Sequence, residues 1–173
     1  MRAFIAAEAS GEVTDYLNRL NDKISMNGVR RLKTFHLTLH FLGEITEEKA
    51  EEIKRIFSDF RFEPIKTKIK GVGYFPEFGD IRVVWVGLHP EDKIMELQKR
   101  VDELLEKAGF EKEIRFKPHM TIARVKFLKK KIWLKDKVRQ TKTEPEKFFI
   151  DKIKLMKSTL TKEGPIYETL AEF

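Results

Sequence analysis

Apolar residues recur along this chain of 173 residues with two different periods, which predict strands and helices. Short apolar runs and alternating apolar positions are typical of strands, whereas an apolar residue every three or four positions is typical of a helix. The expected strands are 2–8, 33–42, 64–73, 81–88, 113–125, 147–157 and 165–172. The expected helices are 10–27, one that begins at 46 and includes 57, 91–108, and a shorter one within 127–140. After the first strand, the order strand, helix, two strands therefore occurs twice, with one additional helix before the second occurrence.

This repeated order predicts an α+β fold. We expect two lobes of mainly antiparallel sheet, related by an approximate two-fold axis, with the helices on the outer faces. The length suits one domain, so residues 1–173 are expected to form a single domain of two intertwined lobes. A cleft between two such lobes is a usual place for a ligand.

Composition narrows the class of protein and of partner. The absence of cysteine excludes disulfides and thiolate metal sites. Charged residues make up 36%, mostly Lys and Glu, with few Asn and Gln, a composition typical of hyperthermophile proteins. The net charge of +7 favours an anionic partner. No apolar run is long enough to cross a bilayer, so we expect a cytoplasmic protein without a membrane partner. Because no pattern in the chain indicates an interface, we also expect a monomer.

One short phrase occurs twice, as His36-Leu-Thr-Leu39 and as His119-Met-Thr-Ile122. Both copies lie in predicted strands, where successive side chains point to opposite faces. The histidine and the threonine of each copy therefore share one face, and the two apolar residues face the core. If the two strands line the central cleft, the cleft contains two imidazoles and two hydroxyls.

Two histidines without cysteine suggest either acid–base catalysis or a metal site. His40 would be a third metal ligand, because strict alternation places it on the face of His36 and Thr38. Threonine is a poor zinc ligand, however, and no carboxylate accompanies the histidines, so the pattern favours acid–base work over metal. One histidine would accept a proton while the other donates one, and Thr38 and Thr121 would hold phosphate oxygens.

Arg124 follows the second phrase and suits a phosphate oxygen pair, because its guanidinium is planar and always charged. Strict alternation would place Arg124 and His119 on opposite faces. A bulge after Thr121 is therefore required if Arg124 is to reach the cleft.

Aromatic and basic residues near the expected cleft are further candidates for substrate binding. Phe75, Phe78 and Trp85 surround the turn between two strands, and Phe75 or Trp85 would stack on a base of single-stranded RNA, unless they belong to the core. The run Lys129–Lys131, with Trp133, would attract a nucleic-acid backbone, although a run of charges is more often a solvated surface.

The chain resembles the 2H phosphoesterases, whose hallmark is a pair of His-apolar-Thr-apolar strands. Within them it is similar to the RNA 2′,3′-cyclic phosphodiesterases, also named 2′-5′ RNA ligases. The resemblance covers nearly the whole chain and rests on the segments 2–6, 35–44, 71–76, 83–88, 117–124 and 164–170.

This resemblance implies hydrolysis of a terminal 2′,3′-cyclic phosphate on RNA to a 2′-phosphomonoester, without a metal or other cofactor. It implies that His36 protonates the leaving 3′ oxygen and that His119 activates water, although the sequence itself does not assign the two roles. It also implies a reverse reaction that forms a 2′-5′ linkage. Fragments of tRNA and small cyclic nucleotides both stay open as substrates, and a module that binds RNA ends or nucleotide phosphate without turnover stays the alternative.

Overall fold

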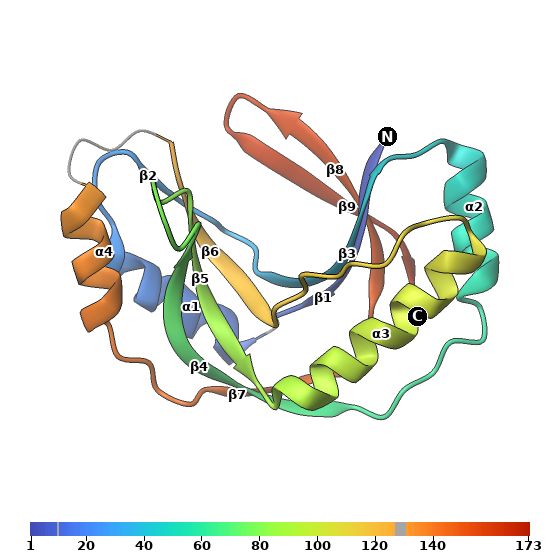
Figure 1. Ribbon diagram of the computed structural model, residues 1–173, viewed down its shortest axis with the longest axis horizontal. Coiled ribbons are helices and arrows are strands. Elements are labelled where there is room, and N and C mark those ends of the chain that lie inside the picture. Colours follow the sequence, from blue (N-terminus) through green and yellow to red (C-terminus); the bar gives the residue numbers. More distant parts are fainter. Residues whose placement is uncertain (10, 127–130) are drawn as a thin grey trace.

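The computed structural model describes residues 1–9, 11–126 and 131–173 (Figure 1). Its strands are β1 (Arg2–Glu8), β2 (Val29–Arg31), β3 (His36–Glu44), β4 (Ile65–Phe75), β5 (Val83–His89), β6 (His119–Val125), β7 (Lys147–Ile150), β8 (Lys154–Thr161) and β9 (Gly164–Glu172). Its helices are α1 (Glu12–Ile24), α2 (Glu47–Ile56), α3 (Glu91–Lys107) and α4 (Lys131–Gln140). The predicted α+β class is confirmed.

The described strands form one sheet in the order β7-β4-β5-β6-β3-β1-β8-β9, in which all neighbours are antiparallel, and β2 pairs with β6. Four strands lie on each side of the junction between β6 and β3, the two strands that carry the repeated phrase. At this junction Leu37 and Met120 are the one pair in register. The two predicted lobes are therefore the two halves of one strongly curved sheet, and the phrase strands meet at its centre.

Each half of the sheet is covered by a helix from the other half. Helix α1 follows β1 in the chain but packs near β6 and α4, whereas α3 follows β5 but packs on β3 as well as on β5. Figure 1 shows α1 and α4 on one side of the molecule and α2 and α3 on the other. This interleaving of the chain between the halves supports the interpretation of residues 1–173 as one domain of two intertwined lobes.

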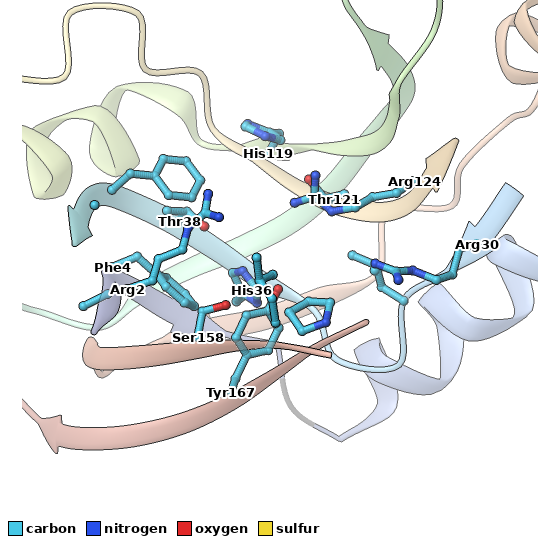
Figure 2. A pocket seen from close by; sticks show the side chains of 16 residues that line it. Arg2, Phe4, Arg30, His36, Thr38, His119, Thr121, Arg124, Ser158 and Tyr167 are labelled. Atoms are coloured by element: carbon cyan, nitrogen blue, oxygen red, sulfur yellow. The ribbon is translucent and has the colours of Figure 1, made fainter. Parts of the chain in front are cut away.

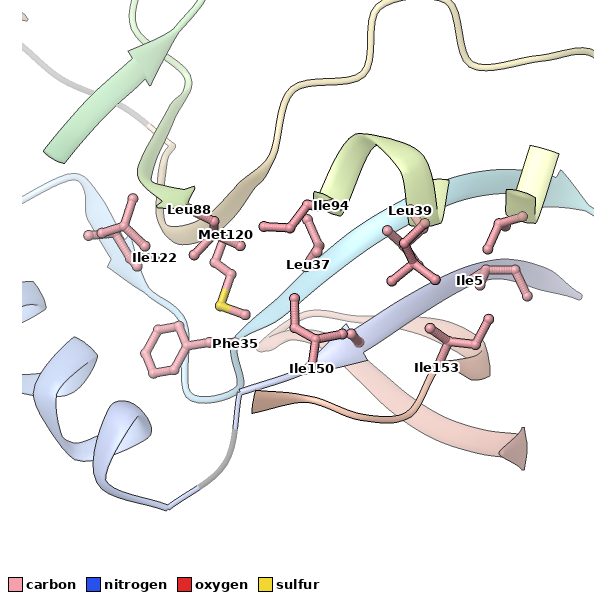
Figure 3. Packing of buried hydrophobic residues seen from close by; sticks show 14 of the residues in the cluster. Ile5, Phe35, Leu37, Leu39, Leu88, Ile94, Met120, Ile122, Ile150 and Ile153 are labelled. Carbon is pink, nitrogen blue, oxygen red and sulfur yellow. The ribbon is translucent and has the colours of Figure 1, made fainter. Parts of the chain in front are cut away.

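The apolar residues of both phrases lie in the core, as their alternation predicts. Leu37, Leu39, Met120 and Ile122 are each 0% exposed, and Figure 3 shows them packed with neighbours from β1 and α3. Burying a side chain of this size contributes about 1.5–3 kcal/mol relative to leaving it exposed. The core thus fixes both strands with their histidines on the opposite face.

Two sequence predictions about strand boundaries are wrong for physical reasons. The strand expected at 113–125 begins only at His119, because Pro118 has no N–H to donate and the N–H of Glu113 bonds to a side chain of α3 instead. The strand expected at 147–157 is two strands, since β7 pairs with β4 in one half and β8 pairs with β1 in the other. The short strand β2 was not predicted.

The expected helix start at Thr46 is confirmed, because its hydroxyl accepts a hydrogen bond from the N–H of Lys49 at 3.1 Å. Ser10, where the first helix was expected to begin, lies outside the described residues. Of the Lys129–Lys131 run, the first two residues and the third side chain also lie outside them. None of the described helices has the length and the apolar character needed to span a membrane.

Candidate active site

Strand β3 contains a bulge directly after its histidine and threonine. Ala6 of β1 is opposite Thr38, and Ile5 is opposite His40, so that Leu39 is an additional residue with no partner of its own. In a bulge, two consecutive residues of one strand face one residue of its neighbour, and the alternation of faces restarts beyond it. Leu39 and His40 therefore both lie on the buried side of β3.

Strand β6 contains a bulge at the equivalent place. Trp85 of β5 is opposite Thr121, and Val84 is opposite Ala123, which leaves Ile122 as the additional residue. The bulge required after Thr121 by the sequence is therefore present. The two halves of the sheet share the arrangement His, apolar, Thr, bulge, cleft-facing residue.

The bulges decide which predicted residues reach the cleft. Arg124 lines the same cavity as both histidines and both threonines, and Phe41 takes the equivalent place in the first half. His40 does not line it: its side chain is buried and contacts α3. The prediction that His40 shares the face of His36 and Thr38 is wrong, because strict alternation ends at the bulge.

A buried polar side chain, from a helix of the opposite half, contacts each bulge region on the buried side of the sheet. Asp102 of α3 contacts His40 Nδ1 through Oδ1 at 2.7 Å and accepts the N–H of Glu113 through Oδ2 at 3.0 Å. The Nδ2 of Asn21, on α1, donates to the carbonyl of Ile122 at 2.7 Å. Asn21, His40 and Asp102 are all buried. We call these two contacts the bulge clamps.

The central cavity has a volume of about 350 Å³ and a strongly positive lining. His36, Thr38, His119 and Thr121 project into it from the two phrase strands (Figure 2). Arg2, Arg30 and Arg124 also line it, with no Asp or Glu among its described lining residues. A cavity with three fixed cations and no carboxylate favours an anionic ligand.

Two of these arginines lie directly opposite each other, since Arg30 of β2 is the register partner of Arg124 on β6. The guanidinium of Arg30 also donates to the carbonyl of Glu163 at 3.4 Å. Like charges opposite each other in an antiparallel pair are destabilising. An anion bound between Arg30 and Arg124 would offset this repulsion, as expected of a phosphate site.

His36 is enclosed by aromatic rings. Its ring centroid lies 5.0 Å from that of Phe4 and 5.0 Å from that of Tyr167, the second contact being edge-on. Burial lowers the pKa of His36 to about 4. Glu8 opposes this lowering, and the charges of Arg124 and His119 add to it. In the free protein His36 is therefore neutral at pH 7.

His119 is oriented by its own backbone. Its Nδ1 donates to the carbonyl of Lys117 at 2.6 Å, because a carbonyl only accepts, so Nε2 is the nitrogen left to exchange a proton with a ligand. Burial lowers the pKa of His119 as well. The bond to the carbonyl partly opposes this lowering, and the Lys117 charge adds to it. Both imidazoles thus favour the neutral form when the cleft is empty.

Phe75 and Trp85 contact His119 from outside the cavity. Their ring centroids lie 5.2 Å and 6.0 Å from the imidazole, and both rings line a neighbouring depression instead of the central one. The indole lies across Gly73, where an added Cβ would be 2.2 Å from the Trp85 ring. Phe75 and Trp85 therefore lie next to His119, but they line a separate depression of the surface.

The residues that line the cavity include four that were not predicted as site residues: Arg2, Phe4, Phe41 and Tyr167. A signal was present for the first two, because Arg2 and Phe4 alternate in a strand and so share a face. Tyr167 lies on β9, which reaches the cleft only through the pairing of β8 with β1 and with β9.

Among the described residues, no group of three His, Asp or Glu side chains is placed to hold a metal ion. The donors that meet in the cavity are two imidazoles, two threonine hydroxyls and three guanidinium groups. Imidazoles exchange protons near neutral pH, and hydroxyls and guanidinium groups donate hydrogen bonds to anions. This set suits proton transfer at a bound phosphoester.

A curved sheet that presents a histidine from each of two equivalent strands to one cavity is typical of phosphoesterases with two histidines. The family model described as the 2′-5′ RNA ligase superfamily matches residues 11–161, and the chain belongs to this family. The resemblance seen in the sequence is thereby confirmed.

Related proteins carry a more specific name. A protein of Methanocaldococcus jannaschii named RNA 2′,3′-cyclic phosphodiesterase is 39% identical over 176 residues, covering 100% of both chains. A protein of the same name from Archaeoglobus fulgidus is 36% identical over 177 residues, covering 100% of this chain and 99% of the relative.

Solved structures share the fold. The crystal structure of TT0787 of Thermus thermophilus matches with a TM-score of 0.79 and 25% identity, covering 100% of this chain and 97% of the other. The apo structure of Escherichia coli LigT matches with a TM-score of 0.78 and 21% identity, covering 99% and 95%.

Proposed function

We propose that the protein hydrolyses the 2′,3′-cyclic phosphate at the end of an RNA to a 2′-phosphomonoester and a free 3′-hydroxyl. The observation that carries this proposal is the meeting of two histidines and two threonines in one cavity with three arginines and no described carboxylate. Membership of the family and the names of the relatives support the same reaction.

The reaction needs two proton transfers. A water oxygen attacks phosphorus, the bond from phosphorus to the 3′ oxygen breaks, and the cyclic ester opens. One histidine accepts the proton of the attacking water, and the other donates a proton to the 3′ oxygen. Thr38 and Thr121 donate hydrogen bonds to the non-bridging oxygens. Arg124 stabilises the negative charge that develops on these oxygens in the transition state. Each proton transfer contributes about 10²–10⁴ in rate.

The pKa values favour one assignment of roles. His36 has a pKa of about 4 and so stays neutral over the wider pH range, which suits the base that accepts the proton of water. The bond from His119 Nδ1 to the Lys117 carbonyl stabilises the protonated ring, which suits the acid. We therefore propose the roles opposite to those that the family resemblance implies.

A substrate with sulfur in place of the bridging 3′ oxygen tests this assignment, because a thiolate leaves without protonation. We expect such a cyclic phosphorothiolate to restore turnover to His119→Ala and not to His36→Ala. Restoration of His36→Ala alone would establish the family-implied order instead.

The reaction itself is tested with an RNA that ends in a 2′,3′-cyclic phosphate, incubated with the purified protein in excess EDTA. We expect a product with a 2′-phosphate and a 3′-hydroxyl, since the groups that meet in the cavity suffice for proton transfer and charge stabilisation. A 3′-phosphate product, or no conversion until divalent ions are added, would contradict the proposal.

The same cavity supports a second outcome of the chemistry. If the 5′-hydroxyl of another RNA replaces water as the nucleophile, opening of the cyclic phosphate forms a 2′-5′ linkage. The histidine and threonine roles are unchanged, so ligation and hydrolysis are distinguished by adding an RNA with a 5′-hydroxyl end and measuring the ligated fraction.

A further inference from the structure

A second depression adjoins the central cavity on the far side of His119. It has a volume of about 560 Å³ and lies between the β4–β5 turn and α4. Phe75 and Trp85 line it and also contact the His119 ring, at 5.2 Å and 6.0 Å between centroids. Because His119 lines the central cavity, these rings are a wall shared by the two spaces. We call this second depression the α4 groove.

The α4 groove is positively charged. Lys117, Lys135 and Arg139 line it, against Glu77 as its one carboxylate among the described lining residues. Two of the cations come from α4 and one from the segment that leads into β6. A polyanion that leaves the central cavity past His119 would therefore meet complementary charge.

The cations of the groove lie over aromatic rings. Lys117 Nζ is 4.4 Å from the centroid of the Trp85 ring. Lys135 Nζ and Arg139 Cζ lie 5.3 Å and 5.7 Å from the centroid of Tyr74, and Arg139 also donates to the Tyr74 hydroxyl at 2.8 Å. These contacts hold the charged groups in place before a ligand arrives.

One ring of the groove is uncovered. Phe78, in the β4–β5 turn, is 84% exposed. An exposed aromatic ring in a groove lined by cations is an arrangement with which proteins bind single-stranded nucleic acid, because a base stacks on the ring while the cations contact the backbone.

We propose that the α4 groove binds the single-stranded RNA segment directly 5′ of the terminal cyclic phosphate. This inference rests on the proposed function, since it assumes that the terminal nucleotide occupies the central cavity. The base of a preceding nucleotide stacks on Phe78, and Lys135 and Arg139 contact the preceding phosphates. The protein therefore acts on oligonucleotide ends in preference to cyclic mononucleotides.

The structure offers a second route for the RNA, which supplies a matched control. A depression on the His36 side is lined by three cations, Arg30, Arg31 and Lys33, but it also contains two carboxylates, those of Glu8 and Glu163. Its one described aromatic lining residue is Tyr167, which already packs edge-on against His36. The α4 groove is favoured because its three cations face one carboxylate instead of two, and because it contains an uncovered ring.

The test compares two substrates: a hexanucleotide that ends in a 2′,3′-cyclic phosphate, and the cyclic mononucleotide of the same terminal base. The measured quantity is the ratio of their kcat/KM values at fixed ionic strength. We expect the double variant Lys135→Ala/Arg139→Ala to lower this ratio about tenfold, and Phe78→Ala to lower it severalfold. The control Arg31→Ala/Lys33→Ala, which removes the same charge from the other depression, leaves the ratio unchanged.

The proposal is overturned if the unmodified protein shows a ratio near one, if the Lys135/Arg139 variant keeps the ratio, or if the control lowers it instead. A protein that hydrolyses neither substrate contradicts the proposed function. In that event the Kd values of a hexanucleotide with a 2′-phosphate end and of 2′-AMP are compared. A tenfold loss confined to the hexanucleotide in the Lys135/Arg139 variant supports the groove, and an unchanged Kd overturns it.

Discussion

The two phrase strands are alike up to their bulges and differ directly after them. Each presents a histidine and a threonine to the cavity, and each then contains one unpaired apolar residue. Beyond the bulge, β3 presents the apolar ring of Phe41, whereas β6 presents the charge of Arg124. The two halves therefore duplicate the histidine and the threonine but not the cavity-lining residue beyond the bulge.

The supports beneath the bulges differ in the same way. The clamp of β3 is a histidine–carboxylate contact that also accepts a backbone N–H, whereas the clamp of β6 is one amide hydrogen bond to a carbonyl. A symmetric pair of histidines is thus set in an asymmetric frame. On the proposed function, this asymmetry would give the substrate one orientation in the cavity.

The largest expected effect removes what the two halves share. His36→Ala and His119→Ala should each lower kcat for the RNA cyclic phosphate by about 10²–10⁴, because each removes one proton transfer. Circular dichroism and the thermal midpoint serve as controls for folding. A variant that folds and keeps its kcat would show that its histidine does not transfer a proton.

The clamps should differ in their contribution to stability. Asp102→Ala leaves the buried Nδ1 of His40 and the partly buried N–H of Glu113 without their acceptor, and it is expected to lower the free energy of unfolding by about 2–4 kcal/mol. Asn21→Ala removes one of two hydrogen bonds to the carbonyl of Ile122, since the N–H of Leu32 also donates to it. It should lower the free energy of unfolding by about 1 kcal/mol. Urea unfolding measures both.

Gln98→Leu is the matched control for the clamps. Gln98 is buried on the same helix as Asp102, and its Nε2 has no partner among the described residues. Gln98→Leu should therefore lower the free energy of unfolding by less than Asp102→Ala does. Equal losses at Asp102 and Asn21 would contradict the difference between the clamps.

A smaller effect is expected at Arg124 and Phe41, the cavity-lining residues that follow the two bulges. Arg124→Ala should raise KM about tenfold and also lower kcat, because it removes a charge-assisted contact to phosphate that strengthens as charge develops on the non-bridging oxygens. Phe41→Ala should raise KM less, and it should leave the dependence of KM on salt as it is, since no charge is removed. Steady-state kinetics at two salt concentrations measure both variants. A weaker salt dependence in the Phe41 variant than in the Arg124 variant would reverse the assignment.

The smallest expected effect concerns pH. The base acts when neutral and the acid when protonated, so kcat/KM follows a bell-shaped curve in pH. Both pKa values lie below 6.5 in the free protein, and that of His36 lies at about 4. The optimum of kcat/KM therefore lies below pH 6.5, with a decline above it as the acid loses its proton.

Glu8→Gln should move the acidic limb of this curve to lower pH, because the carboxylate of Glu8 raises the pKa of His36. Arg124→Ala should move it to higher pH, since the guanidinium lowers that pKa. Profiles of kcat/KM between pH 3 and 9, a range chosen about the reference pKa of histidine, test these shifts. Shifts of the same sign in both variants would contradict the assignment of this limb to His36.

Much of the site could be predicted from the sequence because alternation in strands is local. The spacing of His36 and Thr38, and of His119 and Thr121, sufficed to place four side chains on one face. The requirement for a bulge followed from the same rule. Strict alternation places Arg124 on the face opposite His119, and one additional residue between them moves Arg124 to the face of His119.

The rest depends on contacts between distant segments. The bulge in β3 buries His40, and this is tolerated because Asp102 approaches from a helix in the other half of the chain. Arg30 enters the cavity on a strand of three residues, which is too short to show a period. The roles of the site residues, the monomeric state, the cytoplasmic location and tRNA fragments as substrates stay predictions.

The central claim is that the two histidines act as one proton-transfer unit, and it is tested most directly by kcat of the double variant His36→Ala/His119→Ala beside the two single variants. If both protons move in one step, either single substitution already removes most of the rate, and the double variant should be within about tenfold of the slower single one. Losses that multiply, so that the double variant is slower by the product of both single effects, would contradict a coupled pair.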